Sequence, residues 1–297
     1  MNRLRQITVA AGANFRRWRG SPQIFLAFGL GFVVSFLLSD KVVQFAQQHD
    51  TNLQVFEPFI WTFGDAGSIL TISLLLLLLF ADIPNLGNEV PLFLVRMDRT
   101  TWMLGEILYI TGATFLFLCF ILLSTCLLAG SHAYTANLWS DTAAILGYSR
   151  LGEEIVIPAF VKVLELSFPY TCTIHIFGLM LGYSLVMAGL ILYLNLWRGN
   201  GGVIGGILFS AFGMVLSPQI LSEWLNIPQE RMVVANILFG WISPLNHATY
   251  YMHNFGYDNL PKLWMSYLIF AAESILLFLL SLRRIRTYQF DFSGTQR

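Results

Sequence analysis

The 297 residues carry too little charge for a water-soluble protein of this length. Hydrophobic residues make up 56% of the chain and charged residues only 11%, whereas a soluble domain has roughly 25% charged residues. Lipid must therefore solvate much of the surface, and a net charge of zero gives no electrostatic support for a nucleic-acid partner.

The first 19 residues indicate a helix that lies in the membrane interface. Five arginines are interspersed there with apolar and aromatic residues, and no small-residue cleavage site follows them. This pattern is typical of an amphipathic interfacial helix and not of a cleavable signal peptide. We expect residues 1–19 to form such a helix and to lead into the first membrane span.

Six apolar runs are long enough to cross a bilayer, which takes about 20 residues. They are residues 21–39, 59–80, 103–129, 172–197, 202–221 and 263–282. Two other apolar runs, 155–168 and 233–243, are too short to span and fit interfacial or re-entrant helices. The sequence therefore predicts an all-α integral membrane protein with six transmembrane helices in a single domain.

The basic residues predict the orientation of these spans. If the N-terminus lies inside, the inner segments hold 12 arginines and the outer segments hold five arginines and lysines. Positively charged loops stay on the cytoplasmic side, so both termini are expected inside. Counting 155–168 as a seventh span would leave the three arginines of residues 283–286 outside, which the same rule opposes.

The inner loop at residues 81–102 has the pattern of a docking element. Pro91 suits the first position of a short helix. Leu92 and Val95 supply an apolar face, and Arg96 places a positive charge close to it. A short amphipathic helix parallel to the inner membrane surface would suit a cytoplasmic partner.

Several kinds of chemistry have no motif in this sequence. The chain has no Gly-x-x-x-x-Gly-Lys-Ser/Thr phosphate loop and no His-Glu-x-x-His zinc motif. A serine–histidine protease would need a pair such as Ser184 with His247 or His253, but the Gly-x-Ser signal is weak. We expect both histidines, with Asp258, to be solvated loop residues and not a metal site. The cysteines at 119, 126 and 172 are expected to be small apolar residues, without a disulfide or a metal.

Glu273 lies near the centre of the last apolar run. A charged group there costs about 2.5–3.5 kcal/mol, so it should face the bundle and be paired or protonated. It would line a substrate path or subunit interface, or lock two helices together. Asp65 and Glu106 lie near span ends, from where their side chains can reach the interface.

Six glycines have the small-xxx-small spacing that lets helices approach closely. The pairs are Gly178 with Gly182, Gly201 with Gly205, and Gly202 with Gly206. Both packing within one chain and pairing of two subunits remain open.

With these features, the chain resembles the membrane subunit (permease) of bacterial ABC type-2 exporters, particularly those of Gram-positive peptide- and antibiotic-export operons. Four stretches carry the resemblance: Phe80-Ala81-Asp82-Ile83-Pro84, Arg96-x-x-Arg99-x-x-Trp102-x-x-Gly105, Ile242-Ser243-Pro244-Leu245, and Leu282-Arg283-Arg284-Ile285-Arg286-x-Tyr288-x-Phe290. The long outer loop at 131–171 departs from the family pattern.

The resemblance implies a transport subunit of the bacterial plasma membrane that is not itself an enzyme. Residues 85–98 would be the coupling helix, and residues 222–258 the outer re-entrant region. ATP and Mg²⁺ would be bound by separate ABC ATPase subunits, and the permease would pair with a second, identical or related permease. The coupling to the ATPase would involve Asp82, Pro84, Arg96, Arg99 and Trp102. The substrate moved outward would be a peptide, an antibiotic-like molecule or another lipophilic compound.

Two alternatives lack ATPase coupling. One is a membrane self-protection (immunity) protein that sequesters a toxic peptide. The other is a secondary transporter, which related halves would support, but the sequence has no convincing internal repeat.

Overall fold

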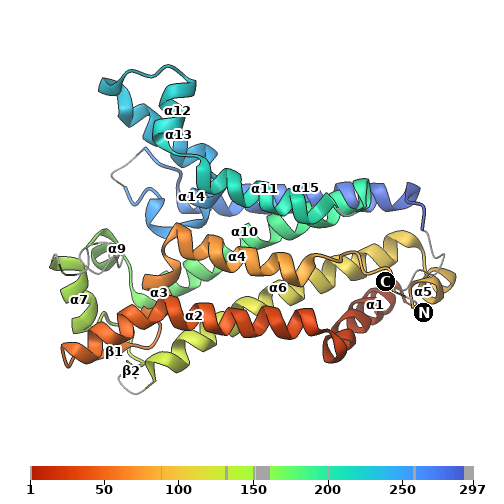
Figure 1. The fold of residues 1–297 in the computed structure, drawn as a ribbon, viewed down its shortest axis with the longest axis horizontal. Coiled ribbons are helices and arrows are strands. Elements are labelled where there is room, and N and C mark those ends of the chain that lie inside the picture. Colours follow the sequence, from red (N-terminus) through yellow and green to blue (C-terminus); the bar gives the residue numbers. More distant parts are fainter. Residues whose placement is uncertain are drawn as a thin grey trace.

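The computed structural model describes residues 2–87, 89–130, 133–149, 151, 161–199, 201–256 and 259–290. The predicted all-α class is confirmed for this part of the chain, which is built almost entirely of helices (Figure 1). The only strands among these residues, β1 (Leu53–Gln54) and β2 (Ala133–Tyr134), form one short parallel pair.

Four helices are long and apolar enough to cross a membrane by themselves. They are α2 (Pro22–Gln48), α6 (Arg99–Ala129), α10 (Pro169–Arg198) and α15 (Leu263–Thr287). In the most apolar window of α10, 61% of the residues are buried, against 22% in α2 and in α15, so α10 lies at the centre of the bundle. Large apolar side chains such as Phe25, Leu123 and Leu268 are exposed on the outer helices. Such a surface is typical of a multi-pass membrane protein.

The structure breaks two of the expected spans. In place of 59–80, α3 (Glu57–Phe63) and α4 (Ala66–Phe80) meet at 89°. In place of 202–221, α11 (Gly201–Val215) and α12 (Pro218–Trp224) meet at 90°. By length and composition, the described residues therefore offer four candidate spans, or up to six if each bent pair crosses as one.

A capping residue starts the second helix of each bent pair. Asp65 accepts hydrogen bonds from the backbone N–H groups of Gly67 and Ser68, and Ser217 accepts one from Ile220. Both capping residues have extended backbone angles, so each begins a new helix in a new direction.

One end of the bundle gathers the N-terminal helix, the loop before α6 and the end of α15. Helix α1 (Arg3–Arg17) and the short turn η1 (Trp18–Gly20) occupy the expected interfacial segment. Helix α5 (Val90–Arg96) is shorter than the expected helix at 85–98. Figure 1 places α1, α5 and the C-terminal end of α15 together, and this end is called the basal end below.

The opposite, distal end carries short helices outside the long spans. They are α7 (Asp141–Tyr148), α9 (Val161–Leu166), α12, η2 (Gln229–Arg231), α13 (Met232–Ile242), α14 (Pro244–Ala248) and η3 (Tyr250–Met252). Helices α12 and α13 project from the bundle (Figure 1). Within the run 155–168, the structure describes only the part from residue 161, and residues 257 and 258 of the expected re-entrant region also lie outside the described residues.

Candidate functional site

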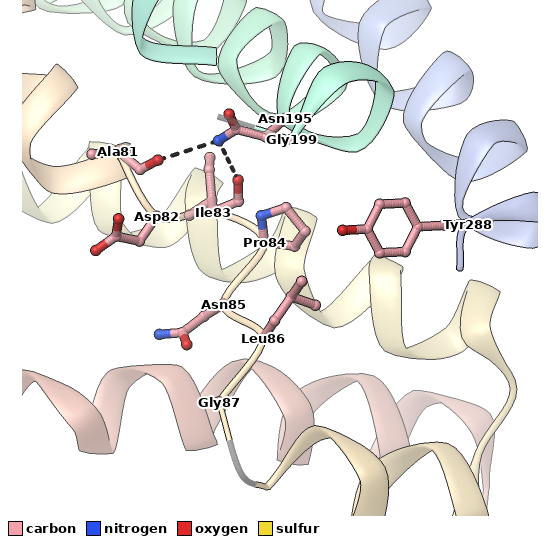
Figure 2. Close-up of a pocket in the computed structure, with 10 residues that line it drawn as sticks. All are labelled: Ala81, Asp82, Ile83, Pro84, Asn85, Leu86, Gly87, Asn195, Gly199 and Tyr288. Carbon is pink, nitrogen blue, oxygen red and sulfur yellow. Dashed lines mark hydrogen bonds between the residues drawn. The ribbon is translucent and has the colours of Figure 1, made fainter. Parts of the chain in front are cut away.

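The chain turns sharply directly after α4, at the basal end. Ile83 and Pro84 are joined by a cis peptide bond, and both side chains are buried. Asn195, a buried residue of α10, holds this turn (Figure 2). Its side-chain Nδ2 donates to the carbonyl oxygens of Ala81 at 3.2 Å and of Ile83 at 2.6 Å.

The same asparagine also holds the start of α11. The Oδ1 atom of Asn195 accepts a hydrogen bond of 2.7 Å from the backbone N–H of Gly202. A Cβ atom on Gly202 would lie 2.5 Å from this Oδ1 and 2.5 Å from the carbonyl oxygen of Ile191. Only glycine fits this contact, so one side chain links the end of α4, α10 and α11.

A cavity of about 360 Å³ opens beside this turn. The expected site residues Asp82 and Pro84 both line it (Figure 2). Asp82 is exposed, and Tyr288, from the segment after α15, lines another part of the cavity. Arg96, Arg99 and Trp102 are not among the lining residues. The cavity therefore brings together only two of the five predicted coupling residues.

Arg99 and Trp102 bind the C-terminal tail. The Nη1 atom of Arg99 donates to the carbonyl oxygens of Arg286 at 3.3 Å and Tyr288 at 2.8 Å. Its guanidinium carbon also lies 5.1 Å from the ring centroid of Phe290, in cation–π range. The buried ring of Trp102 packs edge-on against the same phenylalanine, at 5.8 Å between centroids. Two of the stretches that carry the family resemblance thus meet in space.

Helix α5 displays an apolar surface at the basal end. Val90 is buried, whereas Leu92 is 65% exposed and Val95 is 86% exposed. Arg96 is exposed beside them, and its carbonyl oxygen accepts a 3.3 Å hydrogen bond from the Gln6 side chain of α1. The predicted proline start is present, since Pro91 lies in the first turn.

The contact between α1 and α6 contains residues that the sequence patterns did not single out. Glu106 is buried and accepts a 2.7 Å hydrogen bond from the Asn14 side chain, so it does not extend to the interface as expected. Nearby, Trp18 donates to the Tyr109 hydroxyl at 3.0 Å. Asn14 and Trp18 are four residues apart, and Glu106 and Tyr109 are three apart, so each pair lies on one face of its helix. This spacing does not identify a partner until the two helices are placed together.

Glu273 is half-buried on α15. Among the described residues, no hydrogen bond or ion pair is recorded for its carboxylate. His175 bonds instead with Tyr267 at 3.1 Å, and the Arg198 guanidinium lies 5.0 Å from the Trp197 ring. These contacts of His175 and Arg198 do not involve Glu273.

The glycines of the small-xxx-small pairs contact neighbours within the chain. A Cβ on Gly178 would lie 2.9 Å from the Tyr267 hydroxyl, and one on Gly182 would lie 2.8 Å from the Phe270 ring. On α11, Gly205 faces the Leu194 side chain and Gly206 faces Leu77 and Ile191, with no room for a Cβ, whereas Gly201 has no contact closer than 3.4 Å. Most of these glycines thus serve helix packing inside one subunit.

The expectation that His247 and His253 are solvated loop residues is wrong. His247 is 3% exposed and His253 is 1% exposed, because α14 and η3 pack against the central helix α10. Both imidazoles bond to Ser266 on α15, and Ser184 takes no part.

Asp258 lies outside the described residues. Within the described part of the chain, no group of three or more His, Cys, Asp and Glu residues could hold a metal ion. All three cysteines are free, with Cys172 buried and Cys119 and Cys126 half-buried.

Comparison of the chain with protein-family models, with curated proteins and with solved structures finds no match in any of the three.

Proposed function

We propose that this chain is the permease subunit of an ATP-driven exporter in a bacterial plasma membrane, with six spans and both termini in the cytoplasm. It would pair with a second permease and bind separate ABC ATPase subunits that hold ATP and Mg²⁺. The observation that carries the proposal is α5, a seven-residue helix at the basal end with two largely exposed aliphatic side chains.

The surface of α5 has the chemistry of a docking site for a protein. Leu92 and Val95 project from a helix at the same end as the basic residues of α1 and α15. Clustered apolar side chains next to a charge such as Arg96 are typical of a protein contact with a polar rim. A complementary groove on an ATPase subunit would cover them.

The loop before α5 supplies a mechanical route from this surface into the bundle. Glu89, at the start of α5, lies 3.8 Å from Arg17 of α1 as an ion pair. The turn at Ile83 is held by Asn195, which also binds the start of α11. A push on α5 would therefore reach α1, α4, α10 and α11 together. This is the movement that alternating access requires of a subunit that hydrolyses no ATP itself.

Arg99 and Trp102 have a different role in this proposal from the one that the resemblance implies. They hold the C-terminal tail against the start of α6 and do not themselves face an ATPase. Their contribution is to position the basal end.

Glu273 supports a contact with a second permease or with substrate. Among the described residues, no hydrogen bond or ion pair is recorded for this half-buried carboxyl group, and a carboxyl group at membrane depth favours a polar partner. A peptide, antibiotic-like or other lipophilic substrate with a polar group, or a facing polar residue of the second permease, would supply it.

The test is recovery of an ATPase with the tagged protein from membranes of the native host, solubilised in several mild detergents. The double variant Leu92→Asp/Val95→Asp places charges on the proposed contact and leaves Arg99 and Trp102, which bind the C-terminal tail, unchanged. Leu138→Asp is the matched control, because Leu138 is 63% exposed at the distal end. We expect the wild type and the control to recover the ATPase, and the double variant to recover at least about tenfold less.

Equal recovery with the double variant would contradict the role of α5. Failure of the folded wild type to recover any ATPase would contradict the exporter proposal itself. The sequestering protein would then become the leading alternative.

A further inference from the structure

Two buried histidines share one serine hydroxyl at the distal end. The Nδ1 atom of His247 lies 2.7 Å from the Ser266 Oγ, and the Nε2 atom of His253 lies 2.8 Å from the same oxygen. The other ring nitrogens face backbone carbonyl oxygens, of Trp241 at 3.0 Å and of Tyr250 at 3.0 Å. We call these three side chains the His–Ser–His cluster.

The hydrogen atoms of this cluster can be counted. Carbonyl oxygens only accept, so the ring nitrogens that face Trp241 and Tyr250 must carry protons. In neutral imidazoles, the nitrogens that face Ser266 are then bare acceptors. The serine hydroxyl has one proton and donates to only one of them. Four contacts therefore have three hydrogen atoms, and one contact sets a nitrogen lone pair against an oxygen lone pair.

One added proton completes the network. If one imidazole becomes cationic, it donates to its carbonyl and to the Ser266 Oγ, and the hydroxyl donates to the second imidazole. All four contacts then have one hydrogen atom each. A second proton would leave five hydrogen atoms for four contacts and place two cations on one oxygen.

The surroundings of the cluster oppose the added charge. On α9, the Lys162 ammonium donates to the His253 carbonyl oxygen at 3.1 Å. Other titratable groups lie nearby. Helix α10 contributes Cys172 and His175, η3 contributes Tyr250 and Tyr251, and α15 contributes Tyr267. Among the described residues, these contacts lead to one acidic residue, Asp65, the capping residue of α4, whose Oδ1 atom lies 3.5 Å from the Tyr251 hydroxyl. Lys162 and the low polarity of the site therefore hold proton uptake to acidic pH.

Burial has the same direction of effect on both rings, which lie outside the long spans. It lowers the pKa of His253 to about 4, and it also lowers the pKa of His247. The hydrogen-bond count is independent of these shifts, and it separates the first proton from the second.

We infer that the His–Ser–His cluster is a binding site for a single shared proton that ties α13, α14 and η3 to the first turn of α15. In the neutral cluster one of the four links is broken. In the singly protonated cluster an unbroken chain of hydrogen bonds runs from the Trp241 carbonyl through Ser266 to the Tyr250 carbonyl. Acidification at the distal end therefore tightens the distal helices onto the last span. The inference does not depend on the proposed export function.

The test is nitrogen-15 NMR of histidine-labelled protein in lipid nanodiscs, titrated from about pH 8 to about pH 3. His247→Gln and His253→Gln assign the two rings. We expect the two assigned rings to show one bare nitrogen each at high pH, to lose one of these two signals on acidification, and to keep the other at the lowest pH. Uptake of two protons by these two rings over the same range, or of none, overturns the inference in the wild type alone.

A serine variant tests the role of the hydroxyl. In Ser266→Ala the imidazolium loses its acceptor, so we expect the first proton to bind about one pH unit or more lower, the shift expected when a charge-assisted hydrogen bond is lost. Ser281→Ala is the matched control on the same helix, because this buried hydroxyl bonds only the Leu277 carbonyl of its own helix. An unchanged midpoint in Ser266→Ala also overturns the inference.

Discussion

At the scale of single residues, Gly105 decides how closely α1 approaches α6. A Cβ at this position would lie 2.5 Å from the Ala10 Cβ and 3.1 Å from the Ile7 carbonyl oxygen. Both atoms belong to a neighbouring helix that is also held by the bond between Asn14 and Glu106. The glycine therefore lets the interfacial helix lie directly on the start of a membrane span.

Gly105→Ala should destabilise the protein. The added methyl group forces α1 away from α6, and such overpacking costs about 1–3 kcal/mol. Gly12→Ala is the matched control on α1, since a Cβ there has no atom within 4 Å, and alanine should be neutral or favourable in this helix. Unfolding in detergent, followed by circular dichroism, compares the two. Equal midpoints for the two variants would contradict the close packing of α1 on α6.

The sequence also limited what could be predicted for single residues. Glu273 stands out because a carboxyl group in an apolar run is costly, whatever the fold. Asn195 and Ser266 do not stand out, because a lone polar residue within an apolar run has no visible partner until its helix is placed. The burial of His247 was missed for the same reason, because its contact with Ser266 of α15 is a tertiary contact.

At the scale of elements, capping residues explain where the expected spans and the real helices differ. The hydropathy of 59–80 is continuous through Gly64 and Asp65, so a count of apolar residues passes over the break. Asp65 nonetheless has the chemistry of a helix start, and the Ser217–Pro218 pair has it too. The long helices α6 and α10 were predictable because uninterrupted apolar length specifies them. The two bends could have been predicted only from the capping residues Asp65 and Ser217.

Arg99 holds the tail segment that follows α15. Arg99→Ala removes two hydrogen bonds to the carbonyl oxygens of Arg286 and Tyr288 and the contact with the Phe290 ring. We expect this variant to be cut by trypsin after Arg286 several-fold faster than the wild type, because proteolysis follows the population of the open segment. Arg96→Ala is the control, an exposed arginine of α5 without a recorded tail contact. Equal cutting rates in Arg99→Ala and the wild type would contradict the conclusion that Arg99 holds the tail in place.

At the scale of the whole molecule, the two ends of the bundle differ in construction. At the basal end, Arg17 and Glu89 join α1 to the start of α5, Arg99 holds the tail, and Asn195 links the end of α4 and the start of α11 to α10. The distal end is held by the His–Ser–His cluster. The four long helices and two bent pairs lie between them, so the number of crossings decides which side of the membrane each end faces.

Cysteine labelling of intact cells with a membrane-impermeant reagent tests these crossings. If each bent pair crosses once, Leu92→Cys and Thr287→Cys should react only after permeabilisation, and Leu138→Cys and Trp224→Cys should react at once. The chain with only its native cysteines, which are buried or half-buried, is the background control. With the N-terminus inside, reaction of Leu92→Cys without permeabilisation would make α3 and α4 a re-entrant hairpin. Reaction of Trp224→Cys on the same side as Leu92→Cys would do the same for α11 and α12, because α6 and α10 both cross between Leu92 and the start of α11. Either result would place α5 or the distal helices on the side of the membrane where the proposed function does not allow them.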